Sequence, residues 1–315
     1  MKAVVIWRYG SAEVLQYEEV AQPQIKPNQL LVRVHASSVN PIDWKTRQGM
    51  LSLLTGNNFP LILGFDVAGE VVAVGSQVTR FQMGDAVYGG TSFPGGAYGE
   101  FAAVPENLIA PKPTNLTYEE AATLPLAALT ALQALRDQGN IKSGQSVLIN
   151  GASGGVGMFA VQIAKTLGTE VTGVCSTRNL EFVKSLGADR VIDYTQKDFT
   201  EEGRQYDIIF DAVGKRSLSN CKRVLTPNGI YISTLPTPEV LIQSVLTAFL
   251  PGQKAKFVIE RPNTEDLVYL KELIEAGKLR TVIDRSFPLA EIGLAHSYSE
   301  SERTVGKIAI VVLQD

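Results

Sequence analysis

The sequence predicts an α/β protein in which an irregular, β-rich domain is followed by a doubly wound parallel sheet. Three observations indicate this fold class. Before residue 113, Gly and Pro interrupt short runs that are rich in Val, Ala and aromatic residues. From residue 146 onward, short apolar runs alternate with helix-like segments, which is typical of parallel strands joined by right-handed crossovers. A glycine-rich turn at residues 151–157 separates the first of these strands from its helix.

The β-rich domain is expected to contain strands at Ala3–Trp7, Leu30–Ala36, Val67–Val74, Ala86–Tyr88 and Ala97–Val104. Good helix formers, with acidic residues near the start, then predict helices at Tyr118–Leu124 and Leu126–Asp137. These helices would lead into the second domain.

In the second domain the alternation predicts strands at Ser146–Asn150, Glu170–Ser176, Arg190–Tyr194, Tyr206–Val213, Gly229–Thr234 and Phe257–Glu260. Helix-like segments lie at Met158–Leu167, Leu180–Leu186, Ser217–Val224 and Glu265–Ala276. A last helix, Glu291–Ser299, leads to a strand, Lys307–Leu313, which comes too late for the order of the parallel sheet. We therefore assign this tail to the first domain, which gives one domain of residues 1–120 with 286–315 and another of residues 121–285.

Composition narrows the function class. A net charge of −3 and the lack of a basic stripe argue against nucleic-acid binding. The two cysteines, Cys175 and Cys221, lie far apart without the spacing of a disulfide or metal framework, which favours a reducing compartment. The start of the chain lacks the pattern of a secretory signal, and the greasy stretch Val240–Leu250 is about half of the ~20 residues that a membrane span needs. We expect a cytoplasmic protein whose partner is a small molecule.

The glycine-rich turn predicts a dinucleotide site. It follows an apolar strand and opens a helix, so backbone N–H groups and the positive end of the helix dipole are available to a pyrophosphate. Gly154 and Gly157 fill the second and third glycine positions of the fingerprint, and Ala152 fills the first. An ordinary tight turn is the alternative. The candidate residues of this turn are Ala152, Ser153, Gly154, Gly155, Val156 and Gly157.

The residues after the second strand of this domain favour NADPH over NADH. A site for NAD usually has Asp or Glu there to bind the ribose 2′-hydroxyl, whereas this chain has Ser176, Thr177 and Arg178. Two hydroxyls and a guanidinium suit a 2′-phosphate, because Arg forms bidentate, charge-assisted hydrogen bonds with it. The alternative is that Arg178 is a solvated surface residue.

Several segments occur in an order and at spacings that resemble a known family. They are Asn40-Pro-Ile-Asp-Trp-Lys45, Gly64-Phe-Asp-Val-Ala-Gly-Glu-Val71, Leu124-Pro-Leu-Ala-Ala-Leu-Thr130, the glycine turn and Val191-Ile-Asp-Tyr194. Together they resemble the zinc-free quinone oxidoreductase branch of the medium-chain dehydrogenase/reductase superfamily over nearly the whole chain. Within that branch, residues 179–189 and 278–284 are most similar to the chloroplast envelope quinone oxidoreductase homologues.

The resemblance implies a GroES-like catalytic domain, a Rossmann domain and a cleft that holds the cofactor; it also implies a possible homodimer. By matching position it implies that Asn40 and Thr130 lie near the nicotinamide. It places Ser176, Arg178 and Tyr194 near the 2′-phosphate, with Thr177 and Val213 also in the cofactor site. Phe257, Val258 and Ile259 are implied to flank the nicotinamide end.

The residues depart from those of zinc-dependent relatives. Such relatives carry a Cys ligand where this chain has Asn40 and a His ligand where it has Phe65. A catalytic zinc needs about three protein ligands, and this chain has only His35 and His296 and no Cys before Cys175. We therefore expect no metal.

Without a Lewis acid, removal of hydride from an alcohol is disfavoured, because nothing stabilises the alkoxide. Reduction of a quinone or an α,β-unsaturated carbonyl compound needs only hydrogen-bond donors for the developing oxygen charge. Asn40 and Lys45 are the candidate polar groups near the substrate or the nicotinamide, while solvent or the cofactor ribose would deliver the proton. Asn40 could instead be a turn residue before Pro41, and Lys45 a solvated helix residue.

The sequence thus predicts an NADPH-dependent reductase of the C=C bond of oxo-enes or of quinones. One alternative is a quinone oxidoreductase proper, and another is a non-catalytic NADPH-binding protein, as lens crystallins of this family show by analogy. A zinc alcohol dehydrogenase is disfavoured by the missing ligands.

Overall fold

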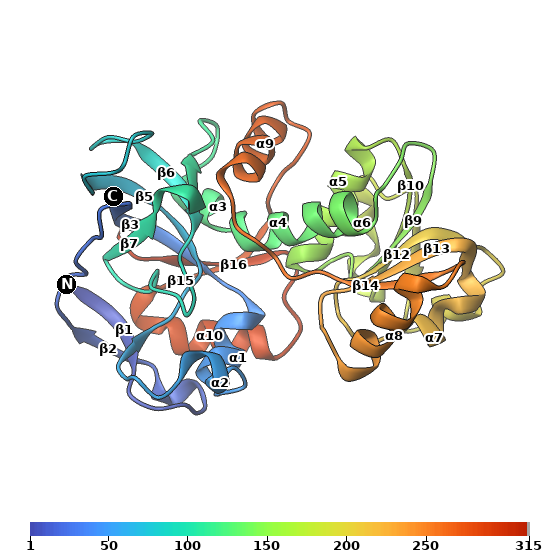
Figure 1. Ribbon diagram of the computed structural model, residues 1–315, viewed down its shortest axis with the longest axis horizontal. Helices are drawn as coiled ribbons and strands as arrows, with labels where there is room; N and C mark the ends of the chain where they lie inside the picture. The colour runs from blue at the N-terminus through green and yellow to red at the C-terminus, as the bar shows by residue number, and fades with distance from the viewer. Residues whose placement is uncertain (314–315) are drawn as a thin grey trace. The chain divides into compact units, whose positions relative to one another are not determined.

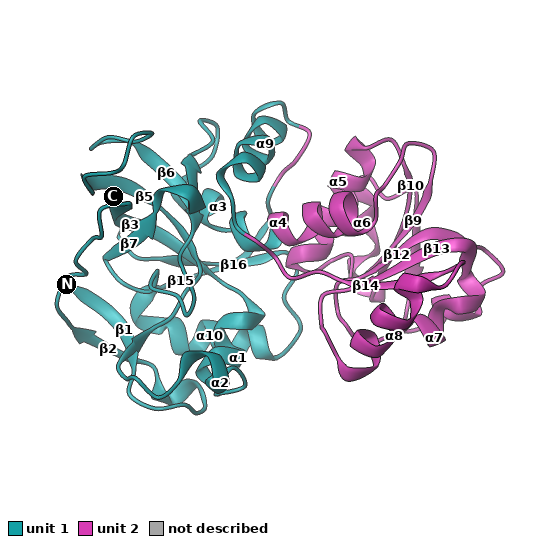
Figure 2. Ribbon diagram, viewed as in Figure 1, with its two compact units in different colours: residues 1–127, 262–277, 281–315 teal, residues 128–261, 278–280 magenta. Residues whose placement is uncertain are grey.

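A computed structural model describes residues 1–313 of the chain (Figure 1). Its contacts divide the chain into two compact units, which Figure 2 colours separately. Unit 1 comprises residues 1–127, 262–277 and 281–315, and unit 2 comprises residues 128–261 and 278–280. Early and late parts of the chain therefore fold together in unit 1.

Unit 1 contains a seven-stranded and a three-stranded sheet. The larger sheet runs in the order β15 (Ile283–Pro288), β16 (Lys307–Val311), β3 (Gln29–Val39), β5 (Asp66–Val74), β6 (Ala86–Gly90) and β8 (Ile109–Pro111), and β7 (Phe101–Pro105) also pairs with β3. The smaller sheet consists of β2 (Gln16–Glu19), β1 (Lys2–Ile6) and β4 (Leu61–Ile62). On β3 the alternate residues Leu30, Val32 and Val34 are buried in one core with residues of β5, as expected for a strand that packs one face on a core.

The helices of unit 1 are α1 (Pro41–Arg47), α2 (Ser52–Thr55), α3 (Tyr118–Ala122), α9 (Thr264–Glu275) and α10 (Ile292–Glu300), and α4 (Pro125–Gln133) starts in it. The terminal strand β16 pairs antiparallel with β3, where Ile308 lies opposite Val39. The C-terminal strand therefore belongs to the larger sheet of unit 1.

Unit 2 is a doubly wound parallel sheet. Its order is β11 (Arg190–Asp193), β10 (Glu170–Cys175), β9 (Ser146–Asn150), β12 (Tyr206–Asp211), β13 (Leu225–Ser233) and β14 (Lys254–Phe257), and every neighbouring pair is parallel. Numbered from β9 in chain order, this is the 3-2-1-4-5-6 order of the Rossmann fold, in which ligands bind where the order reverses. Its helices are α5 (Gly155–Thr166), α6 (Leu180–Ser185), α7 (Leu218–Cys221) and α8 (Pro238–Phe249). The predicted fold class is confirmed.

The last strand of this sheet lies three residues earlier than predicted. The prediction placed it at Phe257–Glu260, whereas β14 spans Lys254–Phe257. Lys254 and Lys256 alternate with apolar residues, so this segment has no continuous apolar run that would mark a buried strand. Both ammonium groups form hydrogen bonds within the fold: Lys254 Nζ donates to the Thr247 carbonyl at 2.6 Å, and Lys256 Nζ donates to the Gln138 carbonyl at 2.6 Å.

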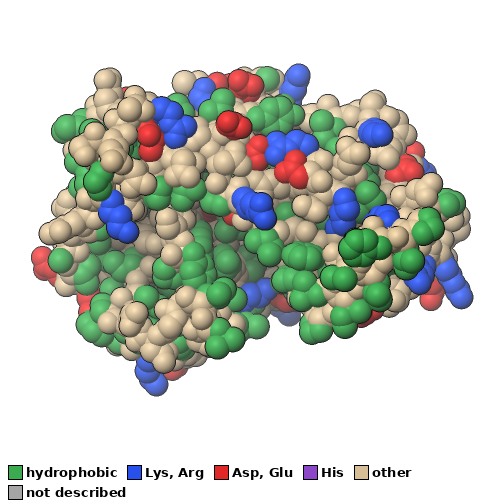
Figure 3. Space-filling model, viewed as in Figure 1, with side chains coloured by type: hydrophobic (Ala, Val, Ile, Leu, Met, Phe, Trp, Pro, Cys, Tyr) green, Lys and Arg blue, Asp and Glu red, His purple; other side chains and the backbone are tan. Residues whose placement is uncertain are grey.

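The greasy stretch Val240–Leu250 forms most of α8. Only Val240 of this helix is buried in the core of unit 2, while the other large apolar side chains of the stretch are exposed. Green apolar atoms accordingly gather over α8 in Figure 3. Among residues 1–313, no helix is long and apolar enough to cross a membrane.

The boundaries of the two compact units differ from those of the predicted domains. We placed 121–285 in one domain, but α9 packs with unit 1. The Tyr88 hydroxyl donates to the Leu267 carbonyl at 2.6 Å, and the Thr264 hydroxyl donates to the Ile109 carbonyl at 2.9 Å. These bonds attach α9 to β6 and β8, a relation that no local pattern in the sequence could reveal.

Candidate functional site

The glycine turn joins β9 to α5, as predicted. Gly151 takes a φ of +80°, which only glycine adopts readily, and its N–H donates to the Val174 carbonyl at 3.1 Å. Gly154 is the N-cap of α5, so the amides that follow it lie in the first helical turn and lack acceptors within the helix. An anion can accept hydrogen bonds from these amides.

Two glycines of the turn differ in what requires them. A Cβ at Gly157 would lie 2.1 Å from the Gly151 carbonyl oxygen, so close packing within the chain excludes any side chain there. A Cβ at Gly154 would meet only that same oxygen, at 3.5 Å, and Gly154 has an ordinary φ of −83°. Nothing in the described chain requires glycine at 154, whereas close approach of a pyrophosphate would.

The ends of β10 and β11 form the corner where we expected the 2′-phosphate. Cys175 pairs with Asp193 in register, so Ser176 to Arg178 and Tyr194 follow adjacent strand ends. Arg178 is exposed, and Tyr194 is 61% exposed. The carboxylate of Asp193 accepts hydrogen bonds from the Thr177 hydroxyl at 2.5 Å and from the Thr195 amide at 3.0 Å. These bonds lower the pKa of Asp193, so the carboxylate is charged at neutral pH.

Two residues that sequence reasoning missed hold the neighbouring loops. Asp211, buried at the end of β12, accepts hydrogen bonds from the amides of Val213 and Gly214 at 3.2 and 3.0 Å. Asn179 donates to Ser153 Oγ at 3.0 Å and so joins the turn after β10 to the glycine turn. A signal did exist for Asp211, since an acidic residue between apolar neighbours in a predicted strand indicates a buried polar role.

The remaining predicted cofactor residues lie apart in the sequence but within unit 2. Val258 follows β14, and its amide donates to the Ser233 carbonyl at 3.0 Å, while Ile259 is exposed and Phe257 packs partly against the core. Thr130 is buried on α4. Phe257 thus belongs to the sheet edge that includes the ends of β12 and β13.

In unit 1, Asn40 ends the long strand β3 and caps α1. Its backbone amide donates to the Asp43 carboxylate at 2.7 Å, and Pro41 occupies the first helical position, where a missing N–H costs nothing. The Asp43 carboxylate thus holds the start of this helix. Asn40 is only 2% exposed, so its side chain lies in the interior of unit 1.

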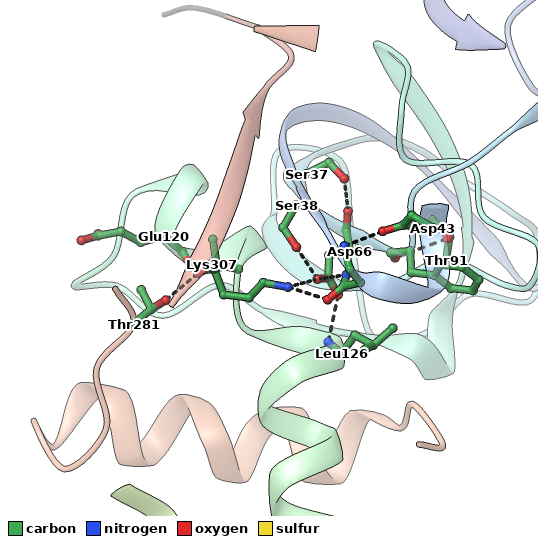
Figure 4. A network of polar contacts seen from close by, with 12 residues as sticks. Ser37, Ser38, Asp43, Asp66, Thr91, Glu120, Leu126, Thr281 and Lys307 are labelled. Atoms are coloured by element: carbon green, nitrogen blue, oxygen red, sulfur yellow. Dashed lines mark hydrogen bonds and ion pairs between the residues drawn. The ribbon is translucent and has the colours of Figure 1, made fainter. Parts of the chain in front are cut away.

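Asp66, at the start of β5, is the centre of a buried polar cluster (Figure 4). One carboxylate oxygen accepts a hydrogen bond from the Leu126 amide at 2.8 Å, at the N-terminus of α4, where the helix dipole favours a negative charge. The other oxygen accepts from the Ser38 hydroxyl at 2.5 Å and from Asn40 Nδ2 at 2.7 Å.

Lys307, the first residue of β16, completes this cluster. Its ammonium donates to Asn40 Oδ1 at 2.5 Å and lies 3.4 Å from the Asp66 carboxylate. The residue is 3% exposed, and burial lowers the pKa of its ammonium while Asp66 and Asp43 oppose that shift. Lys307 was missed from the sequence, where it is the single charge at the head of an apolar strand.

A second chain of hydrogen bonds runs behind Asp43. Arg47 is fully buried and can only donate, so the His296 Nδ1 that it faces at 3.4 Å is an acceptor. His296 Nε2 then carries the hydrogen and donates to the Tyr98 hydroxyl at 3.2 Å, which donates to the Ser38 carbonyl at 3.2 Å. His296 therefore has a structural role in unit 1.

The pKa values of Asp43 and His296 are strongly perturbed in this region. Burial, reinforced by the charge of Asp66, raises the pKa of Asp43 to about 7, although the hydrogen bond from the Asn40 amide opposes the shift. Burial and the positive charge of Arg47 lower the pKa of His296 to about 3, so it is neutral at physiological pH.

Lys45 lies apart from this cluster. It is half-buried on α1, where its ammonium stacks 5.4 Å from the centre of the Trp44 ring, and no hydrogen bond joins it to Asn40 or Asp66. The arrangement favours the alternative reading of Lys45 as a helix residue that contacts solvent.

The residues do not fit a catalytic zinc. Asn40 and Phe65 stand at the two ligand positions that the resemblance identifies, and Asn40 Oδ1 and Nδ2 are engaged by Lys307 and Asp66. Within residues 1–313, no group of three or more His, Cys, Asp or Glu side chains is placed to hold a metal ion. We therefore derive no step through zinc.

Two family models match the chain. The alcohol dehydrogenase GroES-like domain matches residues 26–114, and a model described as zinc-binding dehydrogenase matches residues 186–310. The second description names zinc, but the ligand positions discussed above lie outside its matched range.

Individual proteins match nearly the whole length of this chain. The chain is 39% identical to the chloroplastic quinone-oxidoreductase homolog of Spinacia oleracea, covering 96% of this chain and 95% of that one. It is 35% identical to the chloroplastic NADPH-dependent alkenal/one oxidoreductase of Arabidopsis thaliana, covering 98% of this chain and 79% of that one. Because both relatives are named as chloroplast proteins, the expected cytoplasmic location stays a prediction for this chain.

Among solved structures, the quinone oxidoreductase from Coxiella burnetii matches with a TM-score of 0.90 at 36% identity, covering 99% of each chain. The fold, the ordered motifs and these similarities agree. The chain belongs to the quinone oxidoreductase branch of the medium-chain dehydrogenase/reductase superfamily, a family of NAD(P)-dependent oxidoreductases.

Proposed function

We propose that this protein is an NADPH-dependent reductase of the C=C bond of α,β-unsaturated carbonyl compounds and works without zinc. The observation that supports this most concerns the two positions where relatives carry zinc ligands. One holds the neutral amide of Asn40, which is part of the Asp66 cluster, and the other holds the aromatic ring of Phe65. A buried amide donor can stabilise a carbonyl oxygen that gains negative charge during reduction. It cannot replace the metal that stabilises an alkoxide during alcohol oxidation.

The residues of unit 2 fit the cofactor. The amides that follow Gly154 would bind the pyrophosphate, and Ser176, Arg178 and Tyr194 would surround the 2′-phosphate. Thr177 has a different part, because its hydroxyl hydrogen is committed to Asp193. When bound, the reduced nicotinamide supplies the hydride for the reaction.

Asn40 is the residue that we propose to contact the substrate carbonyl oxygen. Its Nδ2 carries two hydrogens, and one of them is donated to Asp66. The second has no acceptor among residues 1–313 and can be donated to a carbonyl oxygen as the C=C bond is reduced. Charge on that oxygen then meets a fixed donor, which lowers the barrier without a metal.

A quinone is the second candidate substrate, because the Spinacia oleracea relative is named a quinone-oxidoreductase homolog. A quinone also gains negative charge on oxygen, so the same donor would serve both reactions. Rates of NADPH oxidation with a panel of 1-alken-3-ones, alkenals and small benzoquinones separate the two proposals. Higher kcat/KM for the enones than for every quinone supports C=C reduction, while the reverse order supports the quinone candidate.

A non-catalytic role is tested by the same panel. If NADPH binds but no electrophile in the panel is reduced at a measurable rate, the proposed enzymatic function is wrong. Repeating the assay with NADH then measures the cofactor preference under identical conditions.

A further inference from the structure

Lys307 is a charged residue in an environment that disfavours charge. It begins a strand whose next residues, Ile308, Ala309 and Ile310, belong to the apolar core, and an apolar residue at 307 would continue that pattern. A buried ion pair adds little net stability, since desolvation offsets most of the attraction between the charges. Stability alone therefore does not account for an ammonium at this position.

The contacts of Lys307 define the orientation of the Asn40 amide. An ammonium can only donate, so it must face Oδ1; an ionised carboxylate can only accept, so Asp66 must face Nδ2. Rotating the amide by half a turn would set Nδ2 against the ammonium and Oδ1 against the carboxylate. The two charges thus exclude one of the two orientations that an amide otherwise adopts with similar energy.

The same contact polarises the amide. A positive charge 2.5 Å from Oδ1 draws electron density toward that oxygen, which makes the N–H groups of the amide better donors. The effect is larger in a buried site than in water because the local dielectric constant is low. The polarisation therefore strengthens the second Nδ2 hydrogen as a donor, and this hydrogen has no acceptor within residues 1–313.

We propose that Lys307 is a positioning residue: with Asp66 it holds the Asn40 amide in the one orientation that presents a polarised N–H to the substrate oxygen. This inference rests on the proposed reductase function. Zinc-dependent relatives carry their metal ligands at the positions of Asn40 and Phe65. In this chain the Lys307 ammonium supplies a positive charge next to Asn40. Because that charge acts on the developing oxyanion through Asn40, it should affect kcat more than KM.

The first test replaces Lys307. In Lys307→Met we expect kcat for an enone such as 1-octen-3-one to fall ~10- to 100-fold, the range for a reacting group misplaced by about an ångström. We expect KM for the enone and Kd for NADPH to stay within about threefold. Lys307→Arg keeps the positive charge and should recover most of the lost kcat.

Lys307→Met alone leaves the Asp66 carboxylate buried without its partner, which can destabilise the fold. The double variant Lys307→Met with Asp66→Asn removes both charges together, so its melting temperature should approach that of the wild type. We expect its kcat to stay low because the amide is no longer oriented by charge. If kcat recovers together with the melting temperature, the ion pair is merely structural and the inference is overturned.

Arg47→Met is the matched control. Arg47 is a fully buried cation of the same unit that pairs with Glu300 and has no contact with Asn40. This variant should lose stability, while kcat of the folded fraction stays within about twofold of the wild type. An equal loss of kcat in Arg47→Met and Lys307→Met would contradict a specific role for Lys307.

A crystal structure of the double variant gives a result that does not depend on turnover. The inference expects the Asn40 side chain to rotate or to occupy two orientations, whereas an unchanged Asn40 overturns the inference. Lack of enone and quinone turnover by the wild type would instead refute the proposed function, so the two failures can be told apart.

Discussion

The Thr177 hydroxyl donates its hydrogen to the Asp193 carboxylate at 2.5 Å, which joins the turn after β10 to the end of β11. A second contact, 3.0 Å from Thr177 Oγ1 to Thr195 Oγ1, strengthens this connection. The hydroxyl of Thr177 is therefore not available as a donor to a phosphate. The proposed recognition of a 2′-phosphate at this corner would therefore depend on the other residues, above all on Arg178.

The first prediction follows for Arg178→Ala. A hydrogen bond to a charged group contributes ~1.5–3 kcal/mol, so the Kd of NADPH should rise roughly 10- to 150-fold while the Kd of NADH changes little. Arg190→Ala is the control, because Arg190 begins β11 and lies at the opposite end of that strand from Asp193. Titration of cofactor fluorescence measures both constants. An equal loss for the two cofactors would show that Arg178 is structural.

The two glycines of the turn give a matched pair. In Gly157→Ala the new methyl would collide with the Gly151 carbonyl, so we expect the unfolding free energy to fall by ~1–3 kcal/mol. In Gly154→Ala the fold has room for the methyl, so stability should be unchanged. The Kd of NADPH should nevertheless rise at least ~10-fold, because the methyl fills the space for the pyrophosphate. Unchanged NADPH binding in Gly154→Ala would refute the proposed position of the cofactor.

Asp43 makes stability depend on pH. Its folded pKa, about 7, is raised above the ordinary value of 3.8, so its contribution is fully present below pH 3.8 and is lost as the pH rises through about 7. Relative to Asp43→Asn, the wild type should lose about 1.4 kcal/mol per pH unit within that window. Chemical denaturation of both proteins between pH 4 and pH 8 measures this difference. A constant difference across the series would contradict a perturbed carboxyl.

His296 should act in the opposite direction. Its folded pKa, about 3, is below the ordinary value of 6.5, so its contribution is present above pH 6.5 and is lost as the pH falls through about 3. The stability of His296→Gln relative to the wild type should therefore improve as the pH falls from 6.5 toward 4. The same denaturation series tests this. A relative stability that worsens with acid would mean that His296 is charged in the folded protein.

The length of the substrate tail should influence turnover. After α1, the large apolar side chains of Met50, Leu53 and Leu54 are exposed in unit 1, and we expect them to cover the alkyl chain of the substrate. Each buried CH₂ contributes ~0.8 kcal/mol, so kcat/KM should rise roughly fourfold per carbon along a series of 1-alken-3-ones until the tail is covered. Leu53→Ser should flatten this slope, and Met83→Ser, at another exposed apolar residue of unit 1, should not. Equal slopes in all three proteins would place the tail elsewhere.

The sequence predicted the sheet of unit 2 well because its strands are short apolar runs bounded by turns, as in Ser146–Asn150. It failed at β14, where lysines alternate with apolar residues, and at α8, whose apolar face is exposed instead of packed on a core. The glycine turn could be placed because its signal is local. The boundaries of the compact units could not, since they depend on contacts such as that between Tyr88 and Leu267.

The polar cluster of unit 1 shows the same limit. Asn40 was a candidate because it begins a recognisable motif, but its partners lie 26 and 267 residues away. Only the pairing of β16 with β3 and of β3 with β5 brings Lys307 and Asp66 to it. A lysine at the head of a buried strand and an aspartate after Gly64-Phe65 were the available signals, and each alone has several interpretations.

The identity of the product is the most direct test of C=C reduction by this protein. The protein is incubated with NADPH and 1-octen-3-one, and the products are identified by mass spectrometry while cofactor oxidation is followed by absorbance. Reduction of the C=C bond predicts the saturated ketone, formed in a one-to-one ratio with the NADPH that is oxidised. An allylic alcohol as the main product would contradict C=C reduction, and so would oxidation of NADPH without any reduced product.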